Sequence, residues 1–501
     1  MLAETVTRAA RRWHDATAYV AADGWSLSYR DLDRLSDEVA VGLAARGISD
    51  GDVLALLLPA LPEYFVAYAA AAKLGAVTAG VNPRLAPPER NAVMENAGPR
   101  LVLATADLLA GQEARIDAEL VVVEPAHSAD VLLADLRRPG IAPPLRPDPE
   151  RPVAIVYTSG TTGPPRGAVF AGRQLRTITD IDTGGVWGGG SVSMATTALT
   201  HLGPMTKLPG TLVRGGTTHL LTRWTAETAL EMIDRHRMTG FGAIPTQAAL
   251  MLASPHFAEY DLSSLQAVII GGGPATPKLV RECRSRLAPL LSVRYSCTEA
   301  GIGVGTSFDD PPEDAEVSVG RPHAGVRLTV RDTEGSILPD GEIGEVCLAS
   351  AAAMSAYWNN EEATEAVFTA DGAVRTGDLG YVDDQGRLHL AGRSKEMYVR
   401  GGYNVYPQQV EAVLTEYPGI SAVAVVPRVD EIMGEVGTVV VVPSDPRSVP
   451  TLDELRAFAA RSLAKHELPE GLVVLDELPL TSMDKLDRRA LAQLVAGSEP
   501  A

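Results

Sequence analysis

The sequence Tyr157-Thr-Ser-Gly-Thr-Thr-Gly-Pro-Pro-Arg-Gly167 follows directly after a short apolar run, Val153–Tyr157. Its three glycines let the backbone turn sharply and approach a ligand closely. Its hydroxyl groups can donate to phosphate oxygens, and Arg166 adds a permanent positive charge with several donors. The segment is therefore typical of an anion-binding loop at the end of a strand. It is not a Walker loop, because the Gly-Lys-Ser/Thr ending is missing.

The bulk composition excludes several classes of protein. A chain of 501 residues is too long for one hydrophobic core, so two or more domains are expected. The net charge of -19 argues against nucleic acid or an anionic membrane as the main partner. The three cysteines, Cys283, Cys297 and Cys347, form no CxxC pair, and no HExxH is present. We expect no disulfide framework and no zinc site, which fits a cytoplasmic protein.

No membrane span is predicted either. Arg8, Arg11 and Arg12 lead into no apolar core of a signal peptide. The apolar stretch Val53–Val81 is interrupted by prolines, Glu63 and a lysine. A buried strand followed by a packed helix explains this stretch better than a transmembrane helix does.

Helices and strands alternate in the first 125 residues. A helix should begin after a Ser28 cap, and further helices are expected at Glu63–Leu74 and Pro88–Ala97. Val53–Leu58 and Leu101–Ala104 read as buried strands. This alternation predicts βαβ units and a largely parallel sheet covered by helices. The proline-rich segment Arg138–Pro152 then connects to a second α/β region.

That second region contains three short strands, Val153–Tyr157, Val268–Ile270 and Val293–Tyr295, and a helix at Thr225–Met238. Each strand ends at a cluster of small or polar residues, which is where parallel sheets bind ligands. After Gly320, short strands with tight turns predict a small antiparallel, β-barrel-like subdomain. The predicted fold class is α/β, with two βα-layered subdomains and this β subdomain in residues 1–392, and a small α+β domain in residues 393–501.

Five further motifs follow the loop in order. They are Gly271-Gly-Gly-Pro274, Tyr295-Ser-Cys-Thr-Glu299, Arg375-Thr-Gly-Asp-Leu379, Gly392-Arg-Ser-Lys-Glu-Met-Tyr-Val-Arg-Gly-Gly-Tyr-Asn-Val-Tyr-Pro407 and Leu478-Pro-Leu-Thr-Ser-Met-Asp-Lys-Leu-Asp-Arg488. Taken together, residues 27–491 resemble the adenylate-forming superfamily of acyl-CoA synthetases, peptide-synthetase adenylation domains and beetle luciferases. The resemblance implies ATP- and Mg²⁺-dependent activation of a carboxylic acid to an acyl-adenylate. Transfer of the acyl group to coenzyme A would follow.

The resemblance also implies residue roles. Thr298 would bind the α-phosphate, Glu299 would hold Mg²⁺, and Lys485 would be the catalytic lysine assisted by Arg166. The tyrosine of the second motif offers a flat face to adenine, and Asp378 can accept both ribose hydroxyls. The nucleotide-binding residues implied are Thr158, Ser159, Gly160, Thr161, Thr162, Gly163, Gly272, Gly273, Pro274, Tyr295, Ser296, Cys297, Asp378 and Arg393.

A mobile C-terminal domain is implied as well. Lys395 matches the hinge, and the Gly401-Gly402 loop would enter the site during thiol transfer. His201 and Gly271 would flank the acyl and thiol site. Among the departures from the family pattern, Arg166 replaces lysine, Gly273 replaces alanine and Asp484 replaces glycine.

Alternatives remain open at this stage. The thiol could belong to the phosphopantetheine arm of a carrier protein, because both acceptors present the same group. A non-catalytic adenylate-binding homologue is the alternative from another class, and Arg166 and Asp484 are its only support. An amino-acid-activating enzyme is disfavoured, because the stretch Met194–His201 lacks an aspartate to pair with a substrate amine. A luciferase is disfavoured because the same chemistry is far commoner without light.

Overall fold

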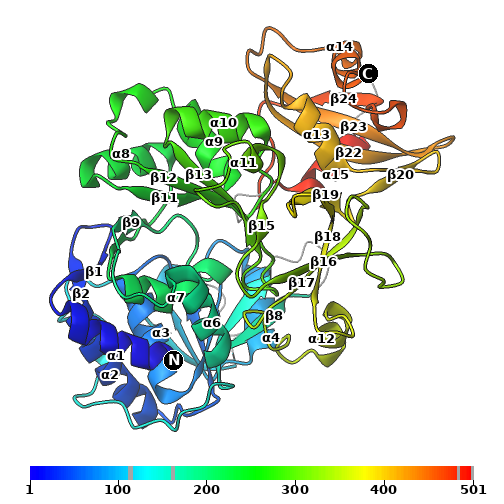
Figure 1. Cartoon of the computed structure of the whole chain (residues 1–501). Coiled ribbons are helices and arrows are strands. Elements are labelled where there is room, and N and C mark those ends of the chain that lie inside the picture. The colour runs from blue at the N-terminus through cyan, green and yellow to red at the C-terminus, as the bar shows by residue number, and fades with distance from the viewer. Residues whose placement is uncertain (111–116, 159–163, 482–485, 498–501) are drawn as a thin grey trace.

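The computed structural model describes residues 1–110, 117–158, 164–481 and 486–497. It is a mixed α/β fold with a large N-terminal domain, blue to yellow in Figure 1, and a small C-terminal domain in orange and red. This confirms the predicted fold class. Within the described ranges, no helix combines the length and the apolar character needed to cross a membrane.

The first layer is a six-stranded sheet in the order β6-β5-β3-β4-β7-β8. Its pairs are parallel except β7 with β8, which is antiparallel. The strands are β3 (Val53–Leu57), β4 (Val77–Gly80), β5 (Leu101–Ala104), β6 (Glu119–Val122), β7 (Pro152–Thr158) and β8 (Arg166–Ala171). Its neighbouring helices are α1 (Leu2–Trp13), α2 (Tyr29–Ala45), α3 (Pro62–Leu74), α4 (Pro87–Ala97) and α5 (Ala106–Leu109).

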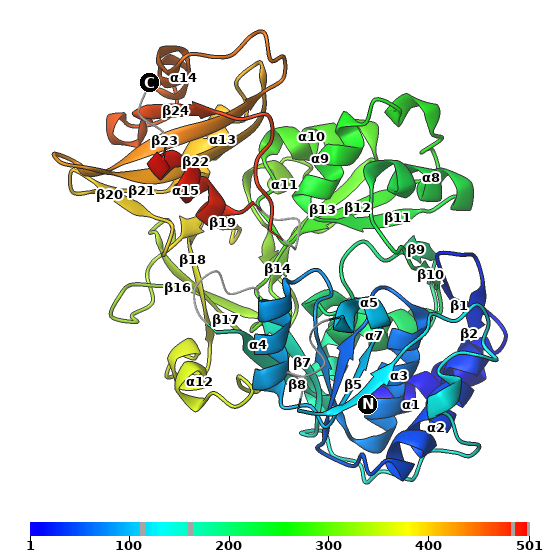
Figure 2. The same cartoon turned by 180° about the vertical axis from the view of Figure 1, so that it is seen from behind.

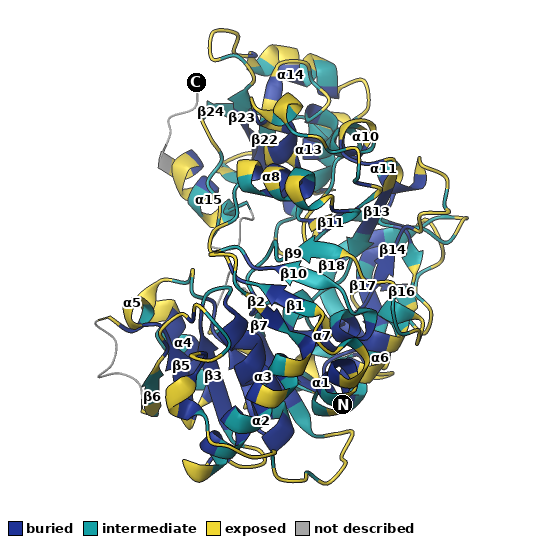
Figure 3. Cartoon of the chain, turned by 90° about the vertical axis from the view of Figure 1, so that its left-hand side faces the viewer, coloured by how far each residue is buried: buried dark blue, intermediate teal, exposed yellow. Residues whose placement is uncertain are grey.

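Burial explains why β3 is apolar throughout. Leu54 and Leu56 pack into the core that contains α2 and α3, whereas Ala55 and Leu57 pack into the core that contains α4. Every residue of β3 is buried, and β3 is dark blue in Figure 3. Figure 2 shows α4 in front of the strands when the molecule is seen from behind. The sheet is therefore covered on both faces, as the sequence predicts.

Local signals place the helices. The Ser28 hydroxyl accepts a hydrogen bond from the Asp31 amide at 3.0 Å, which caps α2. Helix α3 ends at Gly75, whose φ of 79° is the left-handed conformation that glycine allows. The apolar stretch Val53–Val81 thus contains strand β3, helix α3 and strand β4. These predictions are confirmed.

Two more sheets complete the α/β part. One has the order β2-β1-β10-β9, and the other has the order β11-β12-β13-β14-β15. Their strands are β1 (Thr17–Val20), β2 (Ser26–Ser28), β9 (Val192–Met194), β10 (Thr217–His219), β11 (Gly240–Ala243), β12 (Ala267–Gly271), β13 (Leu290–Tyr295), β14 (Val304–Gly305) and β15 (Arg321–Pro322). The accompanying helices are α6 (Gly172–Thr183), α7 (Leu202–Arg214), α8 (Ala226–His236), α9 (Pro245–Ala253), α10 (Pro277–Arg286) and α11 (Asp314–Val317).

The β subdomain expected after Gly320 is a four-stranded antiparallel sheet, β16-β17-β18-β19, with α12 (Glu361–Val367) beside it. The C-terminal domain has the strand order β21-β20-β23-β22, with β24 paired to β23. The strands of these two sheets are β16 (Arg327–Arg331), β17 (Gly344–Ala349), β18 (Val374–Val382), β19 (Leu388–Arg393), β20 (Tyr398–Arg400), β21 (Tyr403–Val405), β22 (Ile420–Asp430), β23 (Gly434–Pro443) and β24 (Gly471–Val474). The C-terminal helices are α13 (Pro407–Leu414), α14 (Leu452–Ala459) and α15 (Arg488–Gly497).

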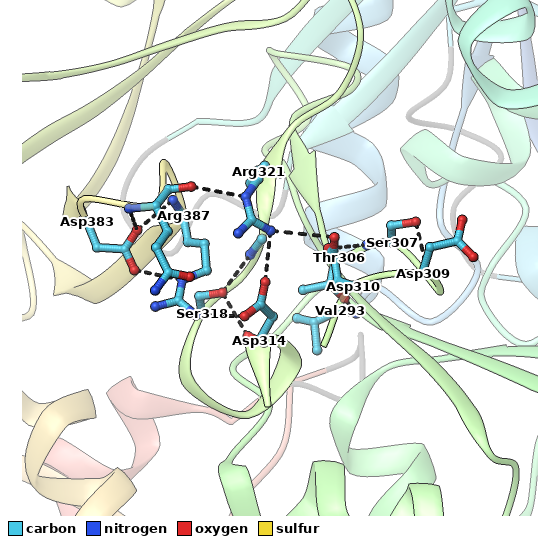
Figure 4. A network of polar contacts seen from close by, with 12 residues as sticks. Val293, Thr306, Ser307, Asp309, Asp310, Asp314, Ser318, Arg321, Asp383 and Arg387 are labelled. Carbon is cyan, nitrogen blue, oxygen red and sulfur yellow. Dashed lines mark hydrogen bonds and ion pairs between the residues drawn. The ribbon is translucent and has the colours of Figure 1, made fainter. Parts of the chain in front are cut away.

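A polar network fixes β15 against the β18–β19 turn (Figure 4). The buried carboxylate of Asp314 accepts from Arg321 at 2.8 Å and from Arg387 at 2.6 Å. Arg387 also pairs with Asp383 at 2.7 Å. Because Asp314 has two cationic partners, its charge is compensated despite its burial, and its pKa is lowered below the ordinary value. The network therefore ties β15 and α11 to the β18–β19 turn.

Candidate active site

The predicted anion loop joins β7 to β8. Thr158 is the last residue of β7 and pairs in register with Arg166, the first residue of β8. The Thr158 hydroxyl lies 3.4 Å from the Arg166 carbonyl oxygen. The residues between them, Ser159, Gly160, Thr161, Thr162 and Gly163, lie outside the described residues.

Strand β8 pairs on its other side with a segment nearly 200 positions later in the chain. The Trp358 amide donates to the Gly167 carbonyl at 2.7 Å, and the Val169 amide donates to the Ala356 carbonyl at 2.9 Å. This pairing places Tyr357 beside Arg166, with the guanidinium carbon 5.6 Å from the ring centroid. Sequence reasoning missed Tyr357, since its only signal is an aromatic pair with Trp358 outside every recognised motif.

Tyr357 joins Arg166 to Glu299. Its hydroxyl donates to Glu299 Oε1 at 2.5 Å. Burial raises the pKa of Tyr357, and the nearby Glu299 carboxylate raises it further. The phenol therefore keeps its proton at neutral pH and acts as a donor. This bond restrains one carboxylate oxygen of Glu299, in a short charge-assisted contact.

A second group of side chains contains the predicted ribose contacts. Asp378 and Arg393 face each other across β18 and β19 and form an ion pair at 3.0 Å. The Tyr295 hydroxyl donates to the other oxygen of Asp378 at 2.7 Å. Burial raises the pKa of Asp378, although Arg393 opposes this shift. The structure thus brings these three sequence-predicted residues together.

The segment between Tyr295 and Glu299 joins the two groups. The Ser296 hydroxyl donates to the Cys297 carbonyl at 3.1 Å, and the Thr298 carbonyl accepts from the Gly301 amide at 3.2 Å. Burial raises the pKa of the Cys297 thiol, and the carboxylate of Glu299 adds to the shift. Cys297 is consequently a thiol at neutral pH, in agreement with the interpretation that it is not a nucleophile.

Three segments meet where the sequence predicts the acyl group. The Thr196 hydroxyl donates to the Gly242 carbonyl at 2.9 Å. Gly271 ends β12, and Gly272 has a φ of 82°. A Cβ atom on Gly272 would lie 3.4 Å from Ile244 Cγ2, so this turn packs closely on the neighbouring segment.

Gly273 and Pro274 continue the loop after β12, and His201 precedes α7. A Cβ atom on Gly273 would lie 3.4 Å from Pro245 Cδ, and Pro274 follows it in the same loop. His201 is the N-cap residue of α7, and its carbonyl accepts from the Met205 amide at 3.1 Å. The roles assigned to these residues remain predictions.

The predicted hinge and thiol-loop residues lie in turns between strands. Lys395 is exposed in the turn that joins β19 to β20. Gly401 and Gly402 form the β20–β21 turn with φ values of 57° and 88°. Lys485, together with Asp484, lies outside the described residues. The boundary at residues 392 and 393 and the hinge role of Lys395 stay predictions.

Known proteins match this architecture over nearly its whole length. The family model for the AMP-binding enzyme matches residues 6–358, and that for the AMP-binding enzyme C-terminal domain matches residues 409–485. The chain therefore belongs to the AMP-binding enzyme family, within the adenylate-forming superfamily, and it is an enzyme.

Named relatives agree with this assignment. The chain is 34% identical to an indoleacetate–CoA ligase of Aromatoleum aromaticum, over 94% of this chain and 93% of that one. It is 31% identical to a fatty acid–[acyl-carrier-protein] ligase, ScoC, of Streptomyces coeruleorubidus, over 95% and 93%. Among solved structures, ATP-bound MatB from Rhodopseudomonas palustris superposes with a TM-score of 0.87 at 26% identity, covering 99% of both chains.

Proposed function

We propose that this enzyme converts a carboxylic acid and ATP into an acyl-adenylate and pyrophosphate, and then transfers the acyl group to the thiol of coenzyme A. One observation carries the proposal. The five-residue segment from Tyr295 to Glu299 connects two polar groups, a carboxylate–arginine pair at Asp378 and Arg393, and Arg166 beside Glu299. The first suits ribose hydroxyls, and the second suits phosphates with a divalent cation.

The chemistry follows from the weakness of a carboxylate as an acyl donor. Attack of the substrate carboxylate on the α-phosphate, with pyrophosphate leaving, gives a mixed anhydride with a good leaving group. Such a transfer depends on positioning and on neutralising charge. Arg166 supplies a cation at the end of β8, and Tyr357 holds Glu299 in place. The family resemblance implies that Lys485 would bridge the carboxylate and the α-phosphate.

A magnesium ion fits the donors present. Mg²⁺ is typically held by one or two carboxylates together with substrate phosphates and waters. Glu299 offers one carboxylate, of which only Oε1 accepts the Tyr357 hydroxyl. Glu299 would hold the ion, which would offset the charge that develops on the phosphates.

Two thiol acceptors share this chemistry. The indoleacetate–CoA ligase favours coenzyme A, whereas the ScoC likeness favours a carrier-protein arm as the second candidate. The proposed second step is a rotation about Lys395 that brings the Gly401-Gly402 loop to the adenylate. The thiol then attacks the acyl carbon and AMP leaves.

The test is ATP–pyrophosphate exchange with a panel of acids, followed by thiol transfer. Fatty, aromatic, cyclic, dicarboxylic and amino acids would each be supplied with ATP and Mg²⁺. Exchange with a non-amino acid supports the proposal, and the acceptor is then assigned by offering coenzyme A and a phosphopantetheinylated carrier protein in parallel. Tight binding of ATP without exchange for any acid would identify a non-catalytic adenylate-binding homologue instead.

A further inference from the structure

Three basic side chains outside the nucleotide site come together from three separate elements. Lys207 lies on α7, Arg294 on β13, and His323 directly follows β15. Arg294 Nη1 lies 2.5 Å from His323 Nε2. The positive charges of Lys207 and Arg294 also act on His323 and on each other. None of the recognised sequence motifs explains this cluster.

The strand register makes room for the guanidinium group of Arg294. Across the sheet, Arg294 pairs with Gly271 on β12 and with Gly305 on β14. A Cβ atom on Gly305 would lie 2.6 Å from Arg294 Cδ and 3.0 Å from His323 Nε2. Glycine on both flanking strands therefore allows the Arg294 side chain to occupy this position.

The cluster combines two cationic side chains with one histidine. Burial lowers the pKa of His323 to about 4, so the imidazole is neutral at pH 7 and accepts a hydrogen bond from Arg294. Burial also lowers the pKa of Arg294. Lys207 and Arg294 each count as one formal positive charge at pH 7. The cluster thus holds two positive charges on a chain whose net charge is -19.

The protein supplies one nearby counter-charge, Asp182, which makes no direct ion pair with the cluster in the described part of the chain. In the part of the chain that the structure describes, no carboxylate forms an ion pair with Lys207 or Arg294. Asp182 is the acid whose charge acts on both, and it pairs instead with Arg214 at 3.2 Å. Lys207 is nevertheless exposed, and Arg294 and His323 are partly exposed. Partly desolvated cations that solvent can reach are a site for an anion.

The position of the cluster indicates which part of the substrate would carry the anion. Arg294 precedes Tyr295 and lies beside Gly271, and Lys207 belongs to the helix that His201 caps. Gly271 and His201 are the residues assigned to the acyl site. An anion bound here would therefore be carried on the acyl part of the substrate, separated from the carboxylate that reacts with ATP.

We propose that Lys207 and Arg294 bind a second carboxylate of the substrate, so that the enzyme activates one end of a dicarboxylic acid. The proposal rests on the adenylation proposed above and names its substrate class. Arg294 can bind a carboxylate with two donors, and Lys207 adds a point charge. His323 is a positioning residue, which accepts from Arg294 and whose amide donates to the Gly303 carbonyl at 3.2 Å.

The experiment measures ATP–pyrophosphate exchange with pairs of acids that have equal numbers of carbon atoms, one monocarboxylic and one dicarboxylic. The wild-type protein should prefer the dicarboxylic member of at least one pair. Arg294→Met and Lys207→Met should each lower kcat/KM for that diacid about 10- to 100-fold, the effect of losing a hydrogen bond to a charged group. Exchange with the matched monoacid should stay unchanged or rise. Arg447→Met, which changes an exposed arginine of the C-terminal domain, is the control and should change neither.

Two failures are distinguishable. Exchange that is best with monoacids and unaffected by Arg294→Met would overturn this inference and leave adenylation intact. Absence of exchange with every acid would contradict the proposed function itself. Thermal unfolding of each variant checks folding. If Arg294→Met is unfolded, Arg294→Lys provides the second measurement, because it keeps the charge and should retain the diacid preference with a raised KM.

Discussion

Replacing Tyr357 with phenylalanine isolates one hydrogen bond in the proposed phosphate site. The hydroxyl donates to Glu299 Oε1 at 2.5 Å, and the ring contacts the Arg166 guanidinium. Phenylalanine keeps the ring and removes only the oxygen. A hydrogen bond to a charged group contributes about 1.5–3 kcal/mol, which corresponds to about 10- to 100-fold in rate or binding. We therefore expect Tyr357→Phe to lower kcat/KM for ATP–pyrophosphate exchange by about that factor.

The Mg²⁺ dependence separates this positioning role from a general loss of stability. If Tyr357 orients Glu299 for a metal ion, the variant should need more Mg²⁺ for half-maximal exchange, while its melting temperature changes little. Tyr417→Phe is a matched control, because Tyr417 packs edge-on against Phe458 in the C-terminal domain, away from the site. If Tyr357→Phe changed neither the exchange rate nor the Mg²⁺ requirement, the assigned role of Tyr357 would be refuted.

Three further variants test other parts of the site. Asp378→Asn should abolish tight ATP binding in calorimetry. It should also raise the melting temperature at pH 7.5, because burial raises the Asp378 pKa and the ionised carboxylate costs stability above that pKa. This gain in melting temperature should fade as the pH falls towards the ordinary pKa of 3.8, and a gain that grows on acidification would contradict it. Lys485→Ala should slow pyrophosphate exchange on the order of 10²–10³-fold while thioester formation from a preformed adenylate continues, and an equal loss in both steps would remove Lys485 from its role. Lys395→Pro should spare exchange and block thioester formation, so normal thioester turnover would count against a hinge there.

Much of the fold could be predicted from local sequence. Local residues determine the helix cap at Ser28 and the helix end at Gly75. They also determine the strands and the helix within Val53–Val81, so the positions of these elements can be predicted from the sequence. The uniformly apolar sequence of strand β3 also predicts a sheet that is covered on both faces. The ribose pair, Asp378 and Arg393, came from motif resemblance, and the structure places the two within ion-pair distance.

Contacts between segments that are distant in the chain could not be predicted from local sequence. Tyr357 reaches Glu299 only because the segment after β17 pairs with β8, and neither residue's neighbours signal this pairing. The Arg294–His323 contact likewise depends on the order β13-β14-β15 and on glycine at position 305. Strand order and register are tertiary properties, and so the basic cluster became visible only in three dimensions.

The central claim is that the substrate carboxylate attacks the α-phosphate of ATP. The most direct measurement uses an acid labelled with ¹⁸O in its carboxylate, together with ATP, Mg²⁺ and coenzyme A, and analyses the nucleotide product by mass spectrometry. Attack by the carboxylate should give AMP that carries one ¹⁸O atom, because one carboxylate oxygen stays with the phosphate when the thiol takes the acyl group. Unlabelled AMP, or ADP as the product, would contradict it.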